Sequence, residues 1–267
     1  MTPDDRELFA RAIPVLLAAW EKRITMTKNH RYRVDGDWQP SVTTIINALD
    51  KPALNIWRMR VQREADIRTA FNLTRGEAQL LASSQEEFRA GFMELAGIQY
   101  EADRLADEAA QVGKQVHSLI EYEIRTRLGQ APPAPEGISD EAHWLFDGWD
   151  DWAKAEGFTP VAAEGRVCSL RYGYAGTFDV IAFIRDELRV GDWKTSPLVY
   201  PEYVLQNVAY RRAAQEMGMP EMGGFLLQLP KDGTGLRTEL LDKYPPDPAF
   251  KAFLAARLAY RWLGGFR

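Results

Sequence analysis

The chain has 267 residues, of which 46% are hydrophobic, and a formal net charge of −5. This length predicts one large domain or two small ones, and the aromatic content excludes a disordered chain. The acidic balance excludes a global basic field, so a nucleic-acid ligand would have to be held by a local patch and by metal.

Further classes are excluded by residue usage. Cys168 is the only cysteine, so an internal disulfide, a cysteine-ligated zinc site and an iron–sulfur cluster all lack their residues. The longest apolar run, residues 12–20, is too short to span a bilayer, and no membrane partner is expected. The acidic first residues are wrong for a secretory signal, so a cytoplasmic location is expected.

The first fifty residues predict three local structures. Residues 4–23 predict an amphipathic helix that is interrupted near Pro14. Asp35-Gly36 stands between short runs of alternating polarity and predicts the turn of a small hairpin. Ser41 is expected to be the N-cap of a short helix. The apolar stripe of that helix is expected to be Val42, Ile45, Ile46 and Leu49.

A helix is expected to begin at about residue 54 and to carry a basic face. Such a face is suited to a phosphate backbone, and an ordinary solvated face explains it equally well. Its arginines are Arg58, Arg60 and Arg63. Residues 72–100 also predict helix.

Residues 101–128 predict the longest helix, which should end at Gly129. Gly113, His117 and Glu121 are spaced by four and form one stripe at the margin of the apolar face. A histidine at such a margin is usually a satisfied core residue, but a glutamate one turn away allows a shared metal site. Gly113 permits the close approach of a strand or of substrate.

Residues 131–137 are rich in proline and predict a stiff linker, followed by a helix over 139–156. The tryptophans of that helix are expected to pack rather than to stack on bases: Trp144, Trp149 and Trp152. A helix over 202–217 presents Gln206 and Tyr210 on one face. The remaining elements are expected to be strands over 161–170, 224–229 and 236–241 and a last helix over 248–263.

Residues 176–195 are the centre of the argument, because they predict a β-hairpin with its turn at Arg185-Asp186. A tight hairpin centred there pairs the strands in step outward from the turn. The expected pairs are Phe183 with Leu188, Ile181 with Val190, and Asp179 with Asp192.

The facing aspartates need an explanation, because like charges directly opposed across a sheet are destabilising. A divalent cation between Asp179 and Asp192 removes the conflict, and Mg²⁺ accepts one or two carboxylates with water and substrate phosphate. Lys194 lies on the same face and could hold a phosphate or polarise a metal-bound water. The plainer interpretation is an exposed hairpin end with solvated charges.

Four motifs in order add to this pair, and together they resemble the PD-(D/E)XK nuclease superfamily, in particular its RecB-like and its phage and mitochondrial exonuclease branch. The motifs are Gly113-x-x-x-His117-x-x-x-Glu121, Gly176-Thr177-Phe178-Asp179, Asp192-Trp193-Lys194 and Gln206-x-x-x-Tyr210. The segment that begins at Ser41-Val42-Thr43 is similar to the N-terminal segment of these relatives. The matches span roughly residues 40–210.

The resemblance implies an α/β fold of restriction-endonuclease type, with a mixed sheet flanked by helices. Residues 1–100 would be a helical N-terminal region that guides DNA, and 101–267 the nuclease core. The implied catalytic residues are Asp179, Asp192, Lys194 and Glu121. The implied Mg²⁺ or Mn²⁺ ligands are His117, Asp179, Asp192 and the main-chain carbonyl of Trp193. The implied DNA-binding residues are Gln206, Tyr210, Ser41, Thr43, Arg58 and Thr195.

The implied function is a metal-dependent exonuclease that acts on single-stranded or end-bearing double-stranded DNA, in repair, recombination or phage DNA processing. A homo-oligomer is compatible with the sequence. Three alternatives stay open: a structure-selective or sequence-specific endonuclease, a non-catalytic DNA-binding module of the same fold, and an enzyme that acts on another phosphodiester.

Overall fold

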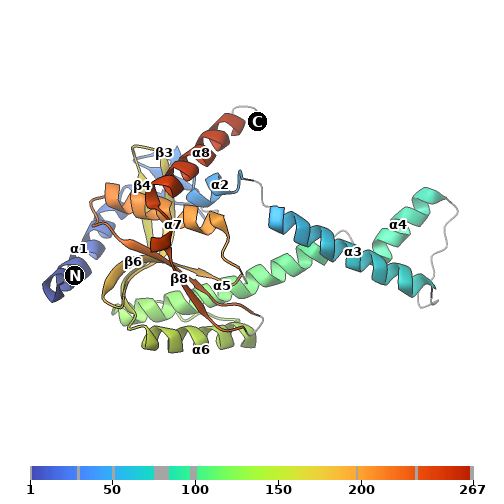
Figure 1. Ribbon diagram of the computed structural model, residues 1–267, viewed down its shortest axis with the longest axis horizontal. Coiled ribbons are helices and arrows are strands. Elements are labelled where there is room, and N and C mark those ends of the chain that lie inside the picture. The colour runs from blue at the N-terminus through green and yellow to red at the C-terminus, as the bar shows by residue number, and fades with distance from the viewer. Residues whose placement is uncertain are drawn as a thin grey trace. The chain divides into compact units, whose positions relative to one another are not determined.

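The computed structural model divides the chain into two compact units (Figure 1). One unit joins Met1–Leu49 to Gly113–Arg267, and the other is Asp50–Val112. The structure describes residues 2–28, 31–49, 52–74, 84–96, 101–196, 198–231 and 234–264. The expected division at residue 100 is therefore corrected, because the first 49 residues belong with the large unit.

Helices and strands follow closely the ranges that the sequence predicts. The helices are α1 (Pro3–Glu21), α2 (Val42–Ile46), α3 (Pro52–Thr74), α4 (Gln85–Ala96), α5 (Glu101–Arg127), α6 (Asp140–Ala155), α7 (Pro201–Glu216), α8 (Pro246–Gly264) and the 3₁₀ helix η1 (Leu241–Lys243). The strands are β1 (Ile24–Met26), β2 (Tyr32–Val34), β3 (Asp37–Gln39), β4 (Thr159–Ser169), β5 (Tyr174–Ile184), β6 (Glu187–Lys194), β7 (Gly223–Gln228) and β8 (Arg237–Leu240).

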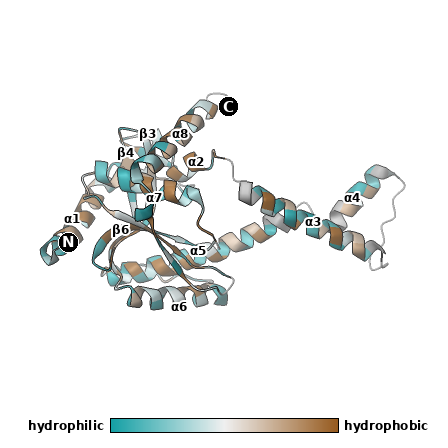
Figure 2. Cartoon of the chain, in the orientation of Figure 1, coloured by the Kyte–Doolittle hydropathy of each residue, from teal (hydrophilic) through white to brown (hydrophobic). Residues whose placement is uncertain are grey.

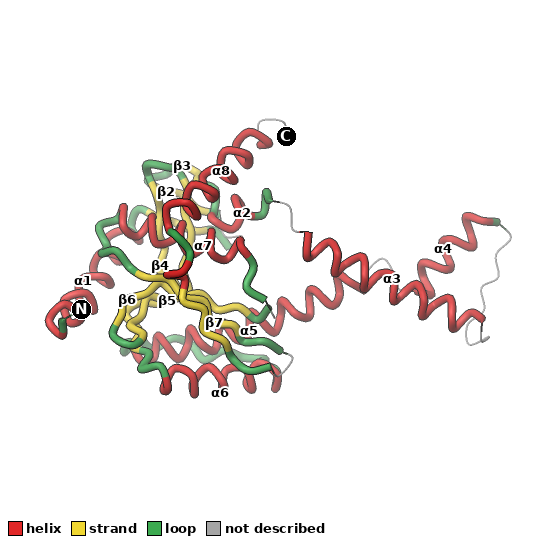
Figure 3. The backbone as a smooth tube through the Cα atoms, viewed as in Figure 1, coloured by secondary structure: helices red, strands yellow, loops and turns green. Residues whose placement is uncertain are grey.

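The large unit is built on a five-stranded mixed sheet with the order β4-β5-β6-β7-β8. Strands β6 and β7 are parallel, and the other neighbours are antiparallel. Helices α7 and α8 lie on one side of the sheet and α5 and α6 on the other (Figures 1 and 3). The expected α/β fold with a mixed sheet flanked by helices is confirmed at this level.

The parallel pair requires a crossover, and α7 makes it between β6 and β7. The chain leaves the carboxyl end of β6 and enters α7 within a few residues. The first turns of α7 therefore lie near the end of β6, which brings two separate sequence motifs together.

The central hairpin forms as the sequence predicts. Arg185 and Asp186 have φ of 48° and 67°, which are the left-handed values of a two-residue type I′ turn. This turn fixes the register, and the expected pairs Ile181↔Val190 and Phe183↔Leu188 are present. The ladder continues to Val180↔Gly191, so the next step aligns Asp179 with Asp192.

A three-stranded sheet, β1-β2-β3, belongs to the same unit. Asp35 and Gly36 have φ of 51° and 93° and make the expected turn between β2 and β3. After it, Ser41 caps α2 by accepting a hydrogen bond from the Thr44 main-chain N–H at 2.9 Å. Ser41 also forms a bridge to Ala175 of β5, which ties this segment to the large sheet.

Two expectations about the chain path are wrong. Helix α1 continues through Pro14, because Ile13 and Leu17 on its inner face are buried in the main core and hold the helix in place. The proline-rich segment over 131–137 does not join two domains, since it connects α5 to α6 inside one unit. Gln115 fixes its end by donating to the Gly137 carbonyl at 2.9 Å.

The helices around the sheet carry both hydrophobic and hydrophilic bands, as amphipathic helices do (Figure 2). Behind β6, α6 contributes an aromatic cluster in which Trp149 meets Trp193 edge to face at 6.0 Å and Trp152 stacks on Phe225 at 6.0 Å. Packing is thus confirmed for Trp149 and Trp152. It is wrong for Trp144, which is 53% exposed.

The second unit holds α3, α4 and the first part of α5. Helix α3 packs on α4, and the expected basic residues lie exposed on α3: Arg58, Arg60 and Arg63. Of the further helix expected over 72–100, residues 75–83 and 97–100 lie outside the described residues.

Candidate active site

The two aspartates of the hairpin lie together where the β5–β6 ladder ends. The Asp192 side chain is 2% exposed and that of Asp179 is 13% exposed. Asp179 Oδ2 accepts a hydrogen bond from the Trp193 main-chain N–H at 2.8 Å, which holds the two strand ends together. The exposed hairpin end with solvated charges is therefore excluded for this pair.

Lys194 and Gln206 complete a compact polar network with Asp192. The Lys194 ammonium forms an ion pair with Asp192 Oδ2 and donates to Gln206 Oε1 at 3.2 Å. The amide nitrogen of Gln206 lies 3.3 Å from Asp192 Oδ1. Gln206 thus accepts from the lysine and donates to the aspartate, which fixes their relative position.

Tyr210 supports this network from beneath. It is 3% exposed, and its hydroxyl accepts a hydrogen bond from Gln206 Nε2 at 3.1 Å. A Cβ on Gly176 would lie 2.5 Å from the Tyr210 ring, so the glycine of the Gly176-Thr177-Phe178-Asp179 motif makes room for the tyrosine. Tyr210 therefore orients Gln206 and is not placed to contact DNA directly.

The stripe on α5 reaches the same point from the other side of the sheet. His117 Nε2 lies 3.0 Å from the Trp193 carbonyl oxygen, and Nδ1 lies 3.6 Å from Asp179 Oδ2. Burial, then the Lys194 charge, lowers the pKa of His117, which is therefore neutral near pH 7. A Cβ on Gly113 would lie 3.1 Å from Thr195 Oγ1, so this glycine permits the expected close approach.

Glu121 lies at the edge of the cluster. Its carboxylate accepts from Arg125 Nε at 2.7 Å, one helical turn away. Its charge still raises the pKa of the neighbouring acids Glu164 and Asp179. The structure places Glu121 near the site but engages it with Arg125.

Glu164 is a site residue that the sequence motifs do not identify. Strand β4 pairs Ala163 with Val180 and Gly165 with Phe178, so Glu164 faces Asp179. Burial, followed by the Asp179 and Glu121 charges, raises the pKa of Glu164 to about 9. Glu164, Asp179 and Asp192 therefore form a row across three adjacent strands.

Two local signals accompany Glu164. It is the only charged side chain in an apolar run, Val161-Ala162-Ala163-Glu164-Gly165. The glycine after it leaves space for a ring, since a Cβ on Gly165 would lie 2.2 Å from Phe178. In addition, Glu164 has φ of 49°, a left-handed conformation that is uncommon for a residue with a side chain. These strained values concentrate at functional sites.

The donor set suits a hard divalent cation. Three carboxylates and a main-chain carbonyl are the oxygen ligands that Mg²⁺ and Mn²⁺ prefer. Asp192 Oδ2 touches the Lys194 ammonium, but not in hydrogen-bond geometry, and this buried oxygen has no hydrogen-bond partner. Burial and the facing Asp179 raise the pKa of Asp192 to about 6.

In the part of the chain that the structure describes, no three histidine, cysteine or acidic side chains are already arranged around one ion position. The contacts explain this arrangement, because Lys194 pairs with Asp192 and the Trp193 N–H pairs with Asp179. Mg²⁺ is commonly held by one or two carboxylates together with water and phosphate, so the residues present fit such an ion.

Lys194 is a charged group and not a base in this arrangement. Although burial lowers its pKa, the charges of Asp192 and Asp179 outweigh that effect and leave the pKa raised. Acting as a general base would require the opposite shift. Of the two roles that the sequence leaves open for Lys194, the structure favours orientation of water or phosphate by a fixed positive charge.

The other expected DNA-binding residues are placed differently. The Ser41 hydroxyl is buried and engaged in capping α2, whereas Thr43 is exposed beside it at 3.0 Å. Thr195 is partly exposed at the end of β6. Arg58 belongs to the unit Asp50–Val112 and is exposed there.

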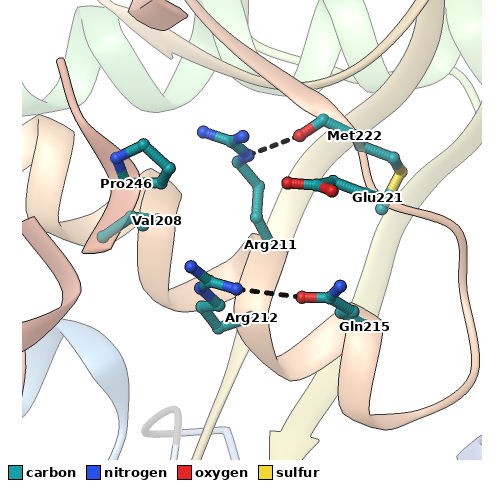
Figure 4. A pocket seen from close by; sticks show the side chains of 7 residues that line it. All are labelled: Val208, Arg211, Arg212, Gln215, Glu221, Met222 and Pro246. Carbon is teal, nitrogen blue, oxygen red and sulfur yellow. Dashed lines mark hydrogen bonds between the residues drawn. The ribbon is translucent and has the colours of Figure 1, made fainter.

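Two hollows in the large unit lie away from the acids. The first holds about 10 Å³, close to one water molecule, and Figure 4 shows Arg211 donating there to the Met222 carbonyl at 2.6 Å. The second, of about 340 Å³, lies between Phe9 and Arg189. The Arg189 guanidinium is engaged there with Glu187 and Asp242.

Stability without a divalent ion is expected to fall as the pH rises, because the folded state holds the Glu164 proton far more tightly than the unfolded chain. Below the ordinary pKa of 4.5 both states bind the proton, and between 4.5 and about 9 only the folded state does. The free energy of unfolding therefore decreases across this window.

Thermal unfolding in a chelator, measured from about pH 5 to about pH 9, tests this expectation. Glu164→Gln should flatten the dependence, whereas Glu123→Gln on α5 should leave it unchanged. A wild-type midpoint that rises steadily with pH would contradict the buried acid row.

Comparisons with known proteins add no family to this geometry. Among the described residues, no helix has both the length and the apolar character needed to cross a membrane. A scan against models of protein families found no match for the chain, and a search of curated proteins found none either.

Proposed function

We propose that the protein is a metal-dependent deoxyribonuclease of PD-(D/E)XK type that acts as an exonuclease on DNA ends. The observation that carries the proposal is the row of Glu164, Asp179 and Asp192 across β4, β5 and β6, with Lys194 beside it. A fold that needed only stability would not bury three facing acids, because each raises the cost of ionising the next.

In this proposal Asp179, Asp192 and the Trp193 carbonyl hold Mg²⁺ or Mn²⁺, with Glu164 next to them. The bound ion would lower the pKa of a water molecule and neutralise charge on the scissile phosphate. The carboxylates orient that water toward the phosphate, and burial keeps their charges unscreened.

Lys194 supplies a fixed positive charge to the same phosphate. Gln206 holds the lysine in place through its Oε1, and Tyr210 holds Gln206. His117 contacts the Trp193 carbonyl and thereby positions the peptide between the two functional side chains of β6. These three residues are positioning residues, and their loss should affect the rate less than the loss of an acid.

The direct test is hydrolysis of end-labelled single-stranded and double-stranded DNA with Mg²⁺ or Mn²⁺ and, in parallel, with a chelator. We expect nucleotides to be released from the ends with a divalent ion and no release in the chelator. Covalently closed circular DNA should stay intact, because it offers no end.

The same assay separates the alternatives. Cleavage of closed circular DNA would replace the exonuclease by an endonuclease with the same site. Hydrolysis of RNA or of nucleotides, but not of DNA, would indicate another phosphodiester. Binding of DNA without cleavage under any divalent ion would overturn the enzymatic proposal.

A further inference from the structure

The outer face of the β2–β3 hairpin carries an exposed tryptophan contacted by two arginines. The guanidinium carbons of Arg31 and Arg33 lie 4.4 and 4.3 Å from the Trp38 ring centroid. The register pairs Arg33 with Trp38, and Arg31 precedes β2 by one residue. The Trp38 side chain is 45% exposed, so the ring is held on the surface by cations and not by a core.

Surface stability alone does not account for this group. An exposed cation–π contact is weak, and one arginine would suffice for it. Within the described residues, neither Arg31 nor Arg33 takes part in an ion pair, whereas the nearby Arg23 is neutralised by Asp35 at 2.5 Å. Two uncompensated cations and an indole are therefore displayed on a chain with a net charge of −5.

The group is tied to the candidate active site through the residue between the two arginines. Side chains alternate along a strand, so Tyr32 points inward where Arg33 points outward, and it is 3% exposed. Its hydroxyl lies 2.9 Å from Thr177 Oγ1 on β5. Thr177 is two residues from Asp179, roughly 7 Å along the strand.

We propose that Arg31, Arg33 and Trp38 bind single-stranded DNA on its way to or from the acid row. This inference rests on the proposed nuclease function and names the form of its substrate at this surface. The two guanidiniums would contact phosphates, and their planes and the indole edge offer stacking surfaces to bases.

Charge and shape favour this partner over the alternatives. A protein partner of acidic character would need only the cations, not the exposed ring. Duplex DNA would use the arginines on its backbone, but its bases are stacked on each other and gain nothing from the indole. An unpaired strand uses all three side chains.

The first experiment measures binding of a fluorescent oligothymidylate in a chelator, so that hydrolysis cannot interfere. Arg31→Ala/Arg33→Ala and Trp38→Ala should each weaken binding by about tenfold or more. The double variant should reduce the slope of log affinity against log salt by about 1.4, since each single-strand phosphate contact contributes about 0.7. Arg31→Lys/Arg33→Lys should restore the slope but not the full affinity.

Arg11→Ala/Arg171→Ala is the matched control, because it also removes two exposed positive charges from the large unit and should leave binding unchanged. All side chains changed are exposed, and circular dichroism checks that each variant folds. Wild-type affinity in the Arg31, Arg33 and Trp38 variants, or no oligothymidylate binding by the wild type, would overturn the inference. An equal loss for duplex and single strand would overturn the choice of an unpaired strand.

A second measurement separates this inference from the proposed function. Hydrolysis of a trinucleotide, too short to reach from the acids to Trp38, should be the same in the variants and the wild type, while hydrolysis of a long single strand should show a raised KM and an unchanged kcat. If the wild type hydrolyses neither substrate, the nuclease proposal fails. The binding result then stands or falls separately.

Discussion

Asp192→Asn is expected to abolish hydrolysis of DNA while the protein remains folded. The substitution removes the carboxylate whose buried Oδ2 has no hydrogen-bond partner, but it keeps a polar group beside Gln206. A loss of about 10³-fold or more corresponds to about 4 kcal/mol of transition-state stabilisation, as expected when a metal ligand is lost.

Stability provides a second readout that does not depend on activity. In the wild type, Mg²⁺ should raise the unfolding midpoint, because an ion that binds only the folded state stabilises it. Asp192→Asn should abolish most of this rise. In a chelator the variant should unfold near the wild-type midpoint, since the lost ion pair with Lys194 is offset by relief of repulsion from Asp179.

Asp151→Asn is the matched control, since its side chain is 86% exposed on α6 and distant in sequence from the acids. It should retain wild-type hydrolysis and the Mg²⁺-dependent rise. Full activity of Asp192→Asn with Mg²⁺ would show that the acid row is not the catalytic site.

Trp149→Ala is expected to cause the largest loss of stability among substitutions outside the acid row. Trp149 is fully buried and contacts Phe146, Phe158 and Trp193. Replacing a buried tryptophan with alanine leaves a cavity and costs about 3–5 kcal/mol. The indole N–H of Trp149 has no hydrogen-bond partner, and removing it recovers part of this cost, so the lower end is expected.

The same helix offers the control. Trp144→Ala removes a 53% exposed side chain and should change the free energy of unfolding by about 0.5 kcal/mol or less. Trp149→Phe keeps an apolar ring and should lose less than Trp149→Ala. Urea unfolding followed by circular dichroism measures all three, and equal midpoints for Trp149→Ala and Trp144→Ala would contradict the burial of this cluster.

The aromatic cluster also bears on the site. Trp193 lies between Asp192 and Lys194 in sequence, and its ring packs among Trp149, Trp152 and Phe225 on the far side of β6. Because side chains alternate along a strand, anchoring this ring directs both neighbours to the opposite face. Loosening the cluster should therefore reduce hydrolysis as well as stability.

The sequence alone determined the hairpin and the alignment of its acids. Both follow from local rules, since the turn at Arg185-Asp186 sets the register and the period of two sets the face. The caps of α2 and α6 at Ser41 and Ser139 followed from equally local chemistry. The same local rules failed at Pro14, where burial of Ile13 and Leu17 holds the helix together despite the proline.

Only the tertiary structure decided which residues gather around that hairpin. Glu164 faces Asp179 because β4 pairs with β5, a choice of strand order that no local pattern encodes. Tyr210 is buried under Gln206, and the α7 crossover brings Gln206 to Lys194, so two residues expected to contact DNA instead hold the acid–lysine pair. The physical reason is that local propensity fixes turns and faces, whereas burial, pKa and partner choice depend on contacts between segments far apart in the chain.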